Sequence, residues 1–237
     1  MHVVGNATSG VVTGLAQHRM CGVLRTSAGG PEPVPVGRQV RLPGVPGAWV
    51  HACDTGYVVL QSVGAEQPAE LVAVAEHRHG QWSDIGVENG TVAAAMLQVQ
   101  AEHADAGPQA FAVAPSVPFE QFNPTAVDAA VLASSWSVHA VFQAASRLVS
   151  IVFFEPNVTL TLPVALSPAR AVSADQPCAL LFSITSPGLG RMTASDPSQT
   201  LAHMTVYVHM PAPTPWRVDL PRGEQAGASV HRDLPLA

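Results

Sequence analysis

The chain has 237 residues, of which 47% are hydrophobic and only 12% are charged, against about 25% charged residues in an average soluble protein. This length can bury a sizeable core in one large or two small domains, and this composition excludes an intrinsically disordered chain. The net charge of −6 disfavours nucleic-acid binding, which needs clustered cations, and all eleven basic residues are arginines. Because no apolar stretch reaches the ~18 residues of a transmembrane helix, we expect no membrane partner either.

The hydrophobic pattern predicts a succession of short β-strands. Apolar runs rich in valine and aromatic residues recur about every ten residues and are separated by turns that contain glycine and proline. In chain order these runs are 49–51, 57–60, 71–75, 96–99, 110–113, 148–154, 158–162, 179–184 and 204–208. Several of them alternate between apolar and polar residues, which is typical of half-buried antiparallel strands. The sequence therefore predicts an all-β protein made of antiparallel β-sandwiches.

One segment is ambiguous between helix and strand. Residues 125–147 are rich in alanine, which favours a helix, whereas Val131, Val138 and Val141 fit short strands equally well. We predict strands because every neighbouring segment has a β pattern.

The last part of the chain is unusually rich in proline. Four prolines between residues 211 and 221 cannot belong to a central strand, and we predict an irregular tail. A second change in composition, at residues 123–125, indicates a boundary between two β units. The predicted domains are residues 1–128, residues 129–212 and the tail at 213–237.

Residue types alone indicate no catalytic or metal site. Cys21, Cys53 and Cys178 are far apart, and their odd number argues against a disulfide scaffold and a structural zinc site, so we expect three small buried hydrophobes. His77 and His79 would share one face of a strand, but no third ligand stands at a diagnostic spacing. No G-x-S-x-G, phosphate-binding loop or H-E-x-x-H motif is present, and we predict no metal and no cofactor.

A series of short phrases is informative through its order. The phrases are G-Y-V-V-L at 56–60, G-Q-W-S-D-I at 80–85, Q-A-F-A-V-A-P at 109–115, V-L-A-S-S-W-S-V-H-A-V at 131–141, V-F-F at 152–154 and A-S-D-P-S-Q at 194–199. This series resembles the β portion of the polysaccharide lyases of family 8, the hyaluronate, chondroitin and xanthan lyases. The resemblance implies a partial central β-sandwich domain, part of a galactose-mutarotase-like supersandwich, followed by a smaller C-terminal β-sandwich. In the last phrase, Asp196 can accept backbone N–H bonds while Pro197 fixes the backbone before the next strand.

The resemblance also suggests where this chain would meet a substrate. Residues 13–19 resemble a T-x-x-E-N-R phrase that lies beside the active site in the family. Ala16 stands where the family has an acidic residue, and His18 stands where it has arginine. From this segment we retain Gln17 and Arg19 as candidate substrate-binding residues.

The resemblance implies a chain without its own catalytic residues. In the family, β-elimination is carried out by Asn, His, Tyr and Arg on a large N-terminal helical domain, and none of them can be placed on this sequence. We therefore expect the chain to be inactive alone, to use no cofactor, and to have as partners an acidic polysaccharide and a separate helical domain or chain. The family is extracellular, although residues 1–6 lack the cationic and apolar regions of a signal peptide.

A stand-alone carbohydrate-binding β-sandwich is the alternative function. Such a module needs an exposed aromatic platform, for which Trp49, Trp82, Trp136 and Trp216 are the candidates. The simplest expectation buries the first three in the core and leaves Trp216 in the tail.

Overall fold

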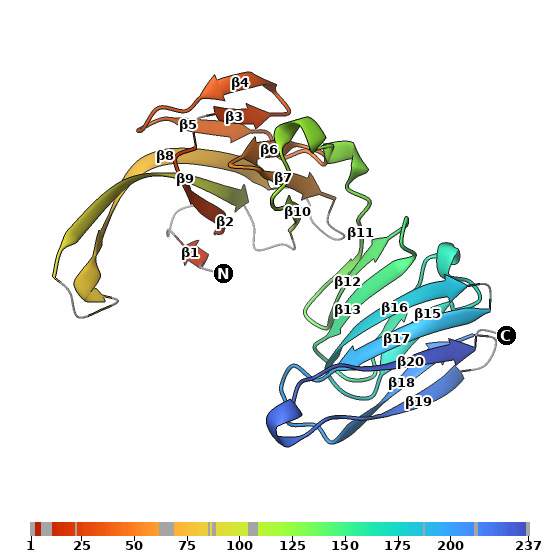
Figure 1. Cartoon of the computed structure of the whole chain (residues 1–237). Coiled ribbons are helices and arrows are strands. Elements are labelled where there is room, and N and C mark those ends of the chain that lie inside the picture. The colour runs from red at the N-terminus through yellow and green to blue at the C-terminus, as the bar shows by residue number, and fades with distance from the viewer. Residues whose placement is uncertain are drawn as a thin grey trace. The chain divides into compact units, whose positions relative to one another are not determined.

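The computed structural model describes residues 3–5, 11–21, 23–61, 69–84, 86, 89–103, 109–186, 188–210 and 213–235. Ile85, which belongs to one of the phrases quoted above, lies outside these residues. The chain forms two compact units, Met1–Val127 and Asp128–Ala237, whose strands are drawn in Figure 1. The helices of the described residues are single 3-10 turns, and none of them is long and apolar enough to cross a membrane.

The first unit consists of two five-stranded antiparallel sheets, with strand orders β1-β2-β9-β8-β5 and β10-β7-β6-β3-β4 (Figure 1). The longest strands, β8 and β9, form a curved hairpin that is plain in Figure 1. The strands are β1 (Val3–Gly5), β2 (Val11–Arg19), β3 (Val23–Thr26), β4 (Gly29–Pro33), β5 (Gln39–Leu42), β6 (Trp49–Ala52), β7 (Thr55–Leu60), β8 (Glu70–Gln81), β9 (Thr91–His103) and β10 (Ala110–Ala114).

The core of this unit follows the period-two pattern of the sequence. Leu71, Ala73 and Ala75 of β8 are fully buried and pack with Leu97 and Val99 of β9 and with side chains of the other sheet. The intervening residues of β8 and β9 point to the opposite face, because successive side chains of a strand alternate. That outer face carries the candidate site.

Close packing of aromatic rings explains the glycine of the G-Y-V-V-L phrase. Gly56 lies against the ring of Phe122, and a Cβ at this position would overlap that ring. Trp49 and His51 contact the same ring, with centroids 5.5 Å and 5.2 Å away. A side chain at position 56 would therefore displace Phe122 from this aromatic cluster.

The prediction for two of the cysteines is wrong. Cys21 and Cys53 form a disulfide across a sequence separation of 32 residues. Cys53 and Asp54 both have positive φ in the turn between β6 and β7, and this turn lies beside the end of β2. Only the folded hairpin brings the two thiols together, so their spacing in the sequence does not reveal the pair. Cys178 is a buried free thiol, as predicted.

The second unit is a sandwich of a six-stranded sheet, β11-β12-β13-β16-β17-β20, and a four-stranded sheet, β14-β15-β18-β19. The segment 125–147 forms the strands β11 and β12, as predicted, with Ala133 and Ala140 facing the core. The strands are β11 (Ala130–Ser134), β12 (Val138–Gln143), β13 (Leu148–Phe153), β14 (Thr159–Thr161), β15 (Ala171–Ala174), β16 (Cys178–Ser186), β17 (Leu189–Ser195), β18 (His203–His209), β19 (Pro213–Asp219) and β20 (Val230–Pro235).

The predicted irregular tail at residues 213–237 is wrong. This segment forms β19, which pairs with β18, and β20, which pairs with β17. β19 is an edge strand, and an edge tolerates proline because the missing N–H can face away from the sheet. Trp216 and Val218 then point into the core, where both are buried.

Candidate functional site

Gln17 and Arg19 lie on the outer face of the sheet β1-β2-β9-β8-β5. Gln17 pairs with Gln98 and Arg19 pairs with Met96 on β9, and both side chains are exposed. Between them, His18 points inward, where its Nε2 lies 2.7 Å from the hydroxyl of Tyr57. The alternation of β2 therefore places the two predicted residues on one face and His18 on the other.

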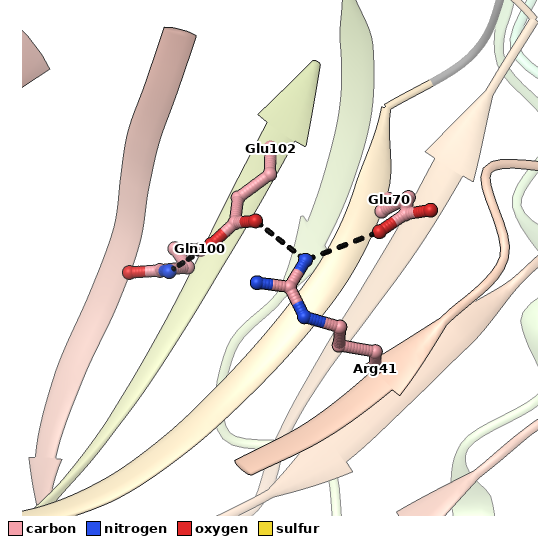
Figure 2. A network of polar contacts seen from close by, with 4 residues as sticks. All are labelled: Arg41, Glu70, Gln100 and Glu102. Carbon is pink, nitrogen blue, oxygen red and sulfur yellow. Dashed lines mark hydrogen bonds and ion pairs between the residues drawn. The ribbon is translucent and has the colours of Figure 1, made fainter. Parts of the chain in front are cut away.

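A network of polar side chains occupies the same face across β5, β8 and β9, as Figure 2 shows. Glu70 and Glu102 are directly opposite each other on β8 and β9, an arrangement that repels when both carboxylates are charged. Nη1 of Arg41 donates to Glu102 at 2.6 Å and to Glu70 at 3.2 Å, and Gln100 donates to Glu102 at 2.7 Å (Figure 2). Arg41 therefore bridges a cross-strand pair of carboxylates and offsets one of their two negative charges.

The network continues along the sheet toward Gln17. Gln98 Nε2 donates to Gln100 Oε1 at 3.1 Å, and Arg78 Nη2 donates to Gln98 Oε1 at 2.9 Å. Since Gln98 is also the cross-strand neighbour of Gln17, this network and the predicted residues form one continuous surface. We call this surface the polar strip; it comprises Gln17, Arg19, Arg41, Glu70, Arg78, Gln98, Gln100 and Glu102.

The three arginines of this surface differ in their availability to an anion. Arg78 forms an ion pair with Glu76. The hydrogen bond to Glu102 raises the pKa of Arg41 above its ordinary value, and the charges of Glu102 and Glu70 add to the effect. This guanidinium is therefore fully charged and already engaged. Among the described residues Arg19 has no ion-pair partner, so it is the cation that could receive a carboxylate or a sulfate.

Tyr57 is not placed to exchange protons with a substrate. Its side chain is fully buried, its hydroxyl is engaged by His18, and burial raises its pKa to about 12. A proton donor or acceptor for elimination must reach the reacting atoms and have a pKa near the working pH. Tyr57 instead anchors the inner side of β2.

The histidine pair on β8 lies in an exposed part of the sheet. His77 and His79 are exposed near the end of the hairpin, and the described residues contain no group of three or more potential metal ligands.

The tryptophans are distributed differently from the expectation. Trp216 is only 3% exposed, whereas Trp136, in the turn between β11 and β12, is 94% exposed. Trp49 is half-buried in the aromatic cluster, and the side chain of Trp82 lies outside the described residues. The last core-facing residue of β11 is Ala133 and the first core-facing residue of β12 is Val138. Trp136 lies in the turn between them and points to solvent.

The sequence predicts Gln17 and Arg19 as site residues but does not single out the rest of the polar strip. The signal was present, because Gln98, Gln100 and Glu102 alternate with buried residues on β9. Arg41 and Glu70 gave no such signal, since only the pairing of β5, β8 and β9 brings them to Glu102.

Comparisons with known proteins agree on the fold. Residues 130–205 match the polysaccharide lyase family 8 C-terminal β-sandwich domain. A chondroitinase AC lyase solved with oligosaccharides superposes with a TM-score of 0.75 at 21% identity, over 96% of this chain and 33% of the lyase. A xanthan lyase from Paenibacillus gives a TM-score of 0.72 at 13% identity, over 96% of this chain and 24% of that one.

A chondroitin AC lyase from Streptomyces coelicolor, solved in complex with chondroitin sulphate, gives a TM-score of 0.60 at 14% identity, over 96% of this chain and 29% of the lyase. The chain thus spans about a quarter to a third of the solved lyases, and no curated protein sequence matches it. The predicted resemblance is confirmed: residues 130–205 match the C-terminal β-sandwich domain of polysaccharide lyase family 8, and the chain has the fold of the β domains of the solved lyases.

Proposed function

We propose that this chain is the β portion of a polysaccharide lyase that cleaves uronic-acid polysaccharides by β-elimination, and that its 237 residues are inactive without a helical catalytic partner. In this role the first unit is a part of the central β-sandwich and the second unit is the C-terminal domain. The observation that carries the proposal is the match of residues 130–205 to a domain of this family, together with the similarity of 96% of the chain to a chondroitinase AC lyase.

The polar strip supports a role beside the substrate. Glutamine side chains both donate and accept hydrogen bonds, as sugar hydroxyls require, and Arg19 offers a charged fork to a uronate or a sulfate. The strip contains no buried acid or base that could abstract a proton. It is therefore suited to binding and positioning, while the chemistry belongs to the catalytic partner.

The disulfide supports an extracellular location for the protein. Disulfides form and persist in oxidising compartments, and Cys21–Cys53 fixes the end of the strand that carries Gln17 and Arg19.

Lyase activity can be tested directly, because β-elimination leaves an unsaturated sugar that absorbs in the ultraviolet. We expect no increase in absorbance when the purified chain is incubated with hyaluronan, chondroitin sulphate or xanthan. Turnover by the chain alone would contradict the proposal.

Binding tests the proposed position of the substrate. We expect the chain to bind chondroitin sulphate oligosaccharides, and Arg19→Ala to weaken this binding about three- to tenfold, as loss of an exposed charge-assisted hydrogen bond would. Arg170→Ala is the control, because Arg170 is an exposed arginine of the second unit. Equal affinities of the two variants in isothermal titration calorimetry would exclude Arg19 from the site.

A further inference from the structure

The six-stranded sheet of the second unit has an apolar hollow of about 360 Å³ on its outer face. The hollow arises because small and large outward side chains alternate across the central strands. Ser150 of β13 is paired with Leu181 of β16, and the next outward pair is Val152 with Ala179. The small members, Ser150 and Ala179, leave a depression between the larger ones.

Hydroxyl groups line this apolar hollow, in its floor and on its β17 side. Besides Ser150, the lining contains Thr193 and Ser195 of β17 and Ser229, which precedes β20. The lining contains no acidic side chain and no arginine, so a fully charged ligand would find no counter-charge there. The hollow therefore suits an uncharged ligand with one apolar face and several hydroxyl groups.

Aromatic rings border the hollow on the β12 side. The ring of His139, which is part of the lining, meets the ring of Phe154 nearly perpendicularly, with centroids 4.9 Å apart. Phe154 is 48% exposed although it is a large hydrophobic side chain, and its backbone N–H donates to Ser137 in the turn that carries Trp136. Exposed rings at the edge of an apolar depression provide faces for the C–H groups of a sugar.

We propose that this hollow binds an uncharged acetamido-sugar residue of a glycan chain. The acetamido methyl group and the C–H face of the ring would pack on Val152, Ala179 and Leu181, and the ring hydroxyls would bond to the serines and the threonine of the lining. A volume of about 360 Å³ lies in the range of small-ligand sites. The choice of an acetamido sugar rests on the proposed function, since hyaluronan and chondroitin alternate such a sugar with a uronate, whereas xanthan contains no acetamido sugar. The site would hold the neutral sugar residue, and the adjoining uronate would lie outside the hollow.

The test uses the whole chain and a trimer of N-acetylglucosamine, which carries no uronate. We expect saturable NMR shifts of the amides around Leu180 and Thr193, with weaker shifts for cellotriose, which lacks the acetamido group. Ala179→Leu fills the hollow and Leu181→Arg covers it with a charge, and each should weaken binding about tenfold or more because a shallow site loses most of its contacts. The control is Val164→Arg, since Val164 is 90% exposed in the 3-10 turn η4 (Val164–Leu166) and does not line the hollow.

Several results would overturn this inference. Absence of saturable shifts would do so, as would unchanged binding in Ala179→Leu with the fold intact by circular dichroism. If the chain self-associates in sedimentation experiments and Leu181→Arg abolishes this without any sugar binding, the hollow is a contact between protein copies. The proposed function is tested separately with the wild-type chain. If the chain binds the neutral trimer but not chondroitin sulphate, the proposed role of Arg19 is refuted and the hollow is not. If the chain binds chondroitin sulphate but not the trimer, the hollow is refuted and the role of Arg19 is not.

Discussion

Asp196 organises the turn between β17 and β18 with both oxygens of its carboxylate. Oδ1 accepts hydrogen bonds from the backbone N–H of Ser198 at 2.8 Å and from its hydroxyl, and Oδ2 accepts from the N–H groups of Thr200 and Leu201, both at 2.8 Å. Burial alone would raise the pKa of Asp196, but these hydrogen bonds outweigh it and hold the pKa below its ordinary value. The turn predicted from the A-S-D-P-S-Q phrase is therefore held together by one ionised side chain.

Replacing Asp196 should destabilise the second unit. Asp196→Ala removes the acceptor of three backbone N–H groups, those of Ser198, Thr200 and Leu201, and we expect the free energy of unfolding to fall by about 2–4 kcal/mol in urea denaturation. Asp219→Ala is the control, because the Asp219 side chain is 83% exposed and its contact with Arg217 is an exposed ion pair. A similar decrease in the free energy of unfolding in the two variants would contradict this role of Asp196.

The depressed pKa of Asp196 also gives the effect a pH dependence. Because the carboxyl binds its proton less readily in the folded state, its contribution is fully present above the unfolded pKa of about 4 and is lost as the pH falls through the lower folded value. The stability difference between the wild type and Asp196→Asn should therefore be constant near pH 7 and shrink below about pH 4.

Strand β2 is held on its inner side and at its end by contacts that are distant in sequence. Tyr57 of β7 bonds to His18, and the disulfide joins Cys21 to Cys53 in the turn between β6 and β7. Both contacts connect the sheet that carries the polar strip to the other sheet of the first unit. The outward orientation of Gln17 and Arg19 therefore depends on how β2 is tied to β6 and β7.

Reduction of the disulfide should loosen the first unit. For a separation of 32 residues, loop entropy predicts a loss of about 3–4 kcal/mol in the free energy of unfolding. Urea unfolding with and without reductant measures this, and Cys21→Ser/Cys53→Ser, which lacks the bridge, should not respond to reductant.

Thiol counting provides an independent check of the disulfide. Burial raises the pKa of the Cys178 thiol to about 12, with a contribution from Asp175 and Asp196, so it should not react in the folded protein. After unfolding without reductant, one thiol, that of Cys178, should react with a thiol reagent. After unfolding with reductant, all three thiols should react. Three reactive thiols without reduction would show that Cys21 and Cys53 are not bridged.

The two units have separate hydrophobic cores. The core of the second unit is built entirely from residues after Asp128 and includes Phe153, Phe182, Met192 and Trp216. A β-sandwich of this size with a continuous core has what it needs to fold alone.

Residues 128–237 expressed alone should therefore unfold cooperatively. We expect a single thermal transition with a midpoint within about 5 °C of the corresponding transition in the whole chain, followed by circular dichroism and calorimetry. A fragment that removes β19 and β20 by ending at residue 212 should lose this transition, because Trp216 and Val218 complete the core. A truncated fragment that melts as sharply would show that residues 213–237 are the dispensable tail that the sequence predicts.

Local patterns were sufficient to predict most of the strands, the all-β class and the resemblance to a lyase family. Alternation of apolar residues and turn residues acts over a few positions, so the turn at Asp196 could be predicted from its own segment, whereas β11 and β12 were predicted from the β pattern of their neighbours. An ordered series of such segments gave the resemblance to polysaccharide lyase family 8 that the match of residues 130–205 confirms. The bridge between Arg41 and Glu102, 61 residues apart, could not be predicted in this way. The same holds for the Cys21–Cys53 bond, for β19 as an edge strand that accepts proline, and for the hollow between Ser150 and Ala179. Each of these depends on which strands are neighbours and in which register they pair, and that is decided only when the sheets assemble around their cores.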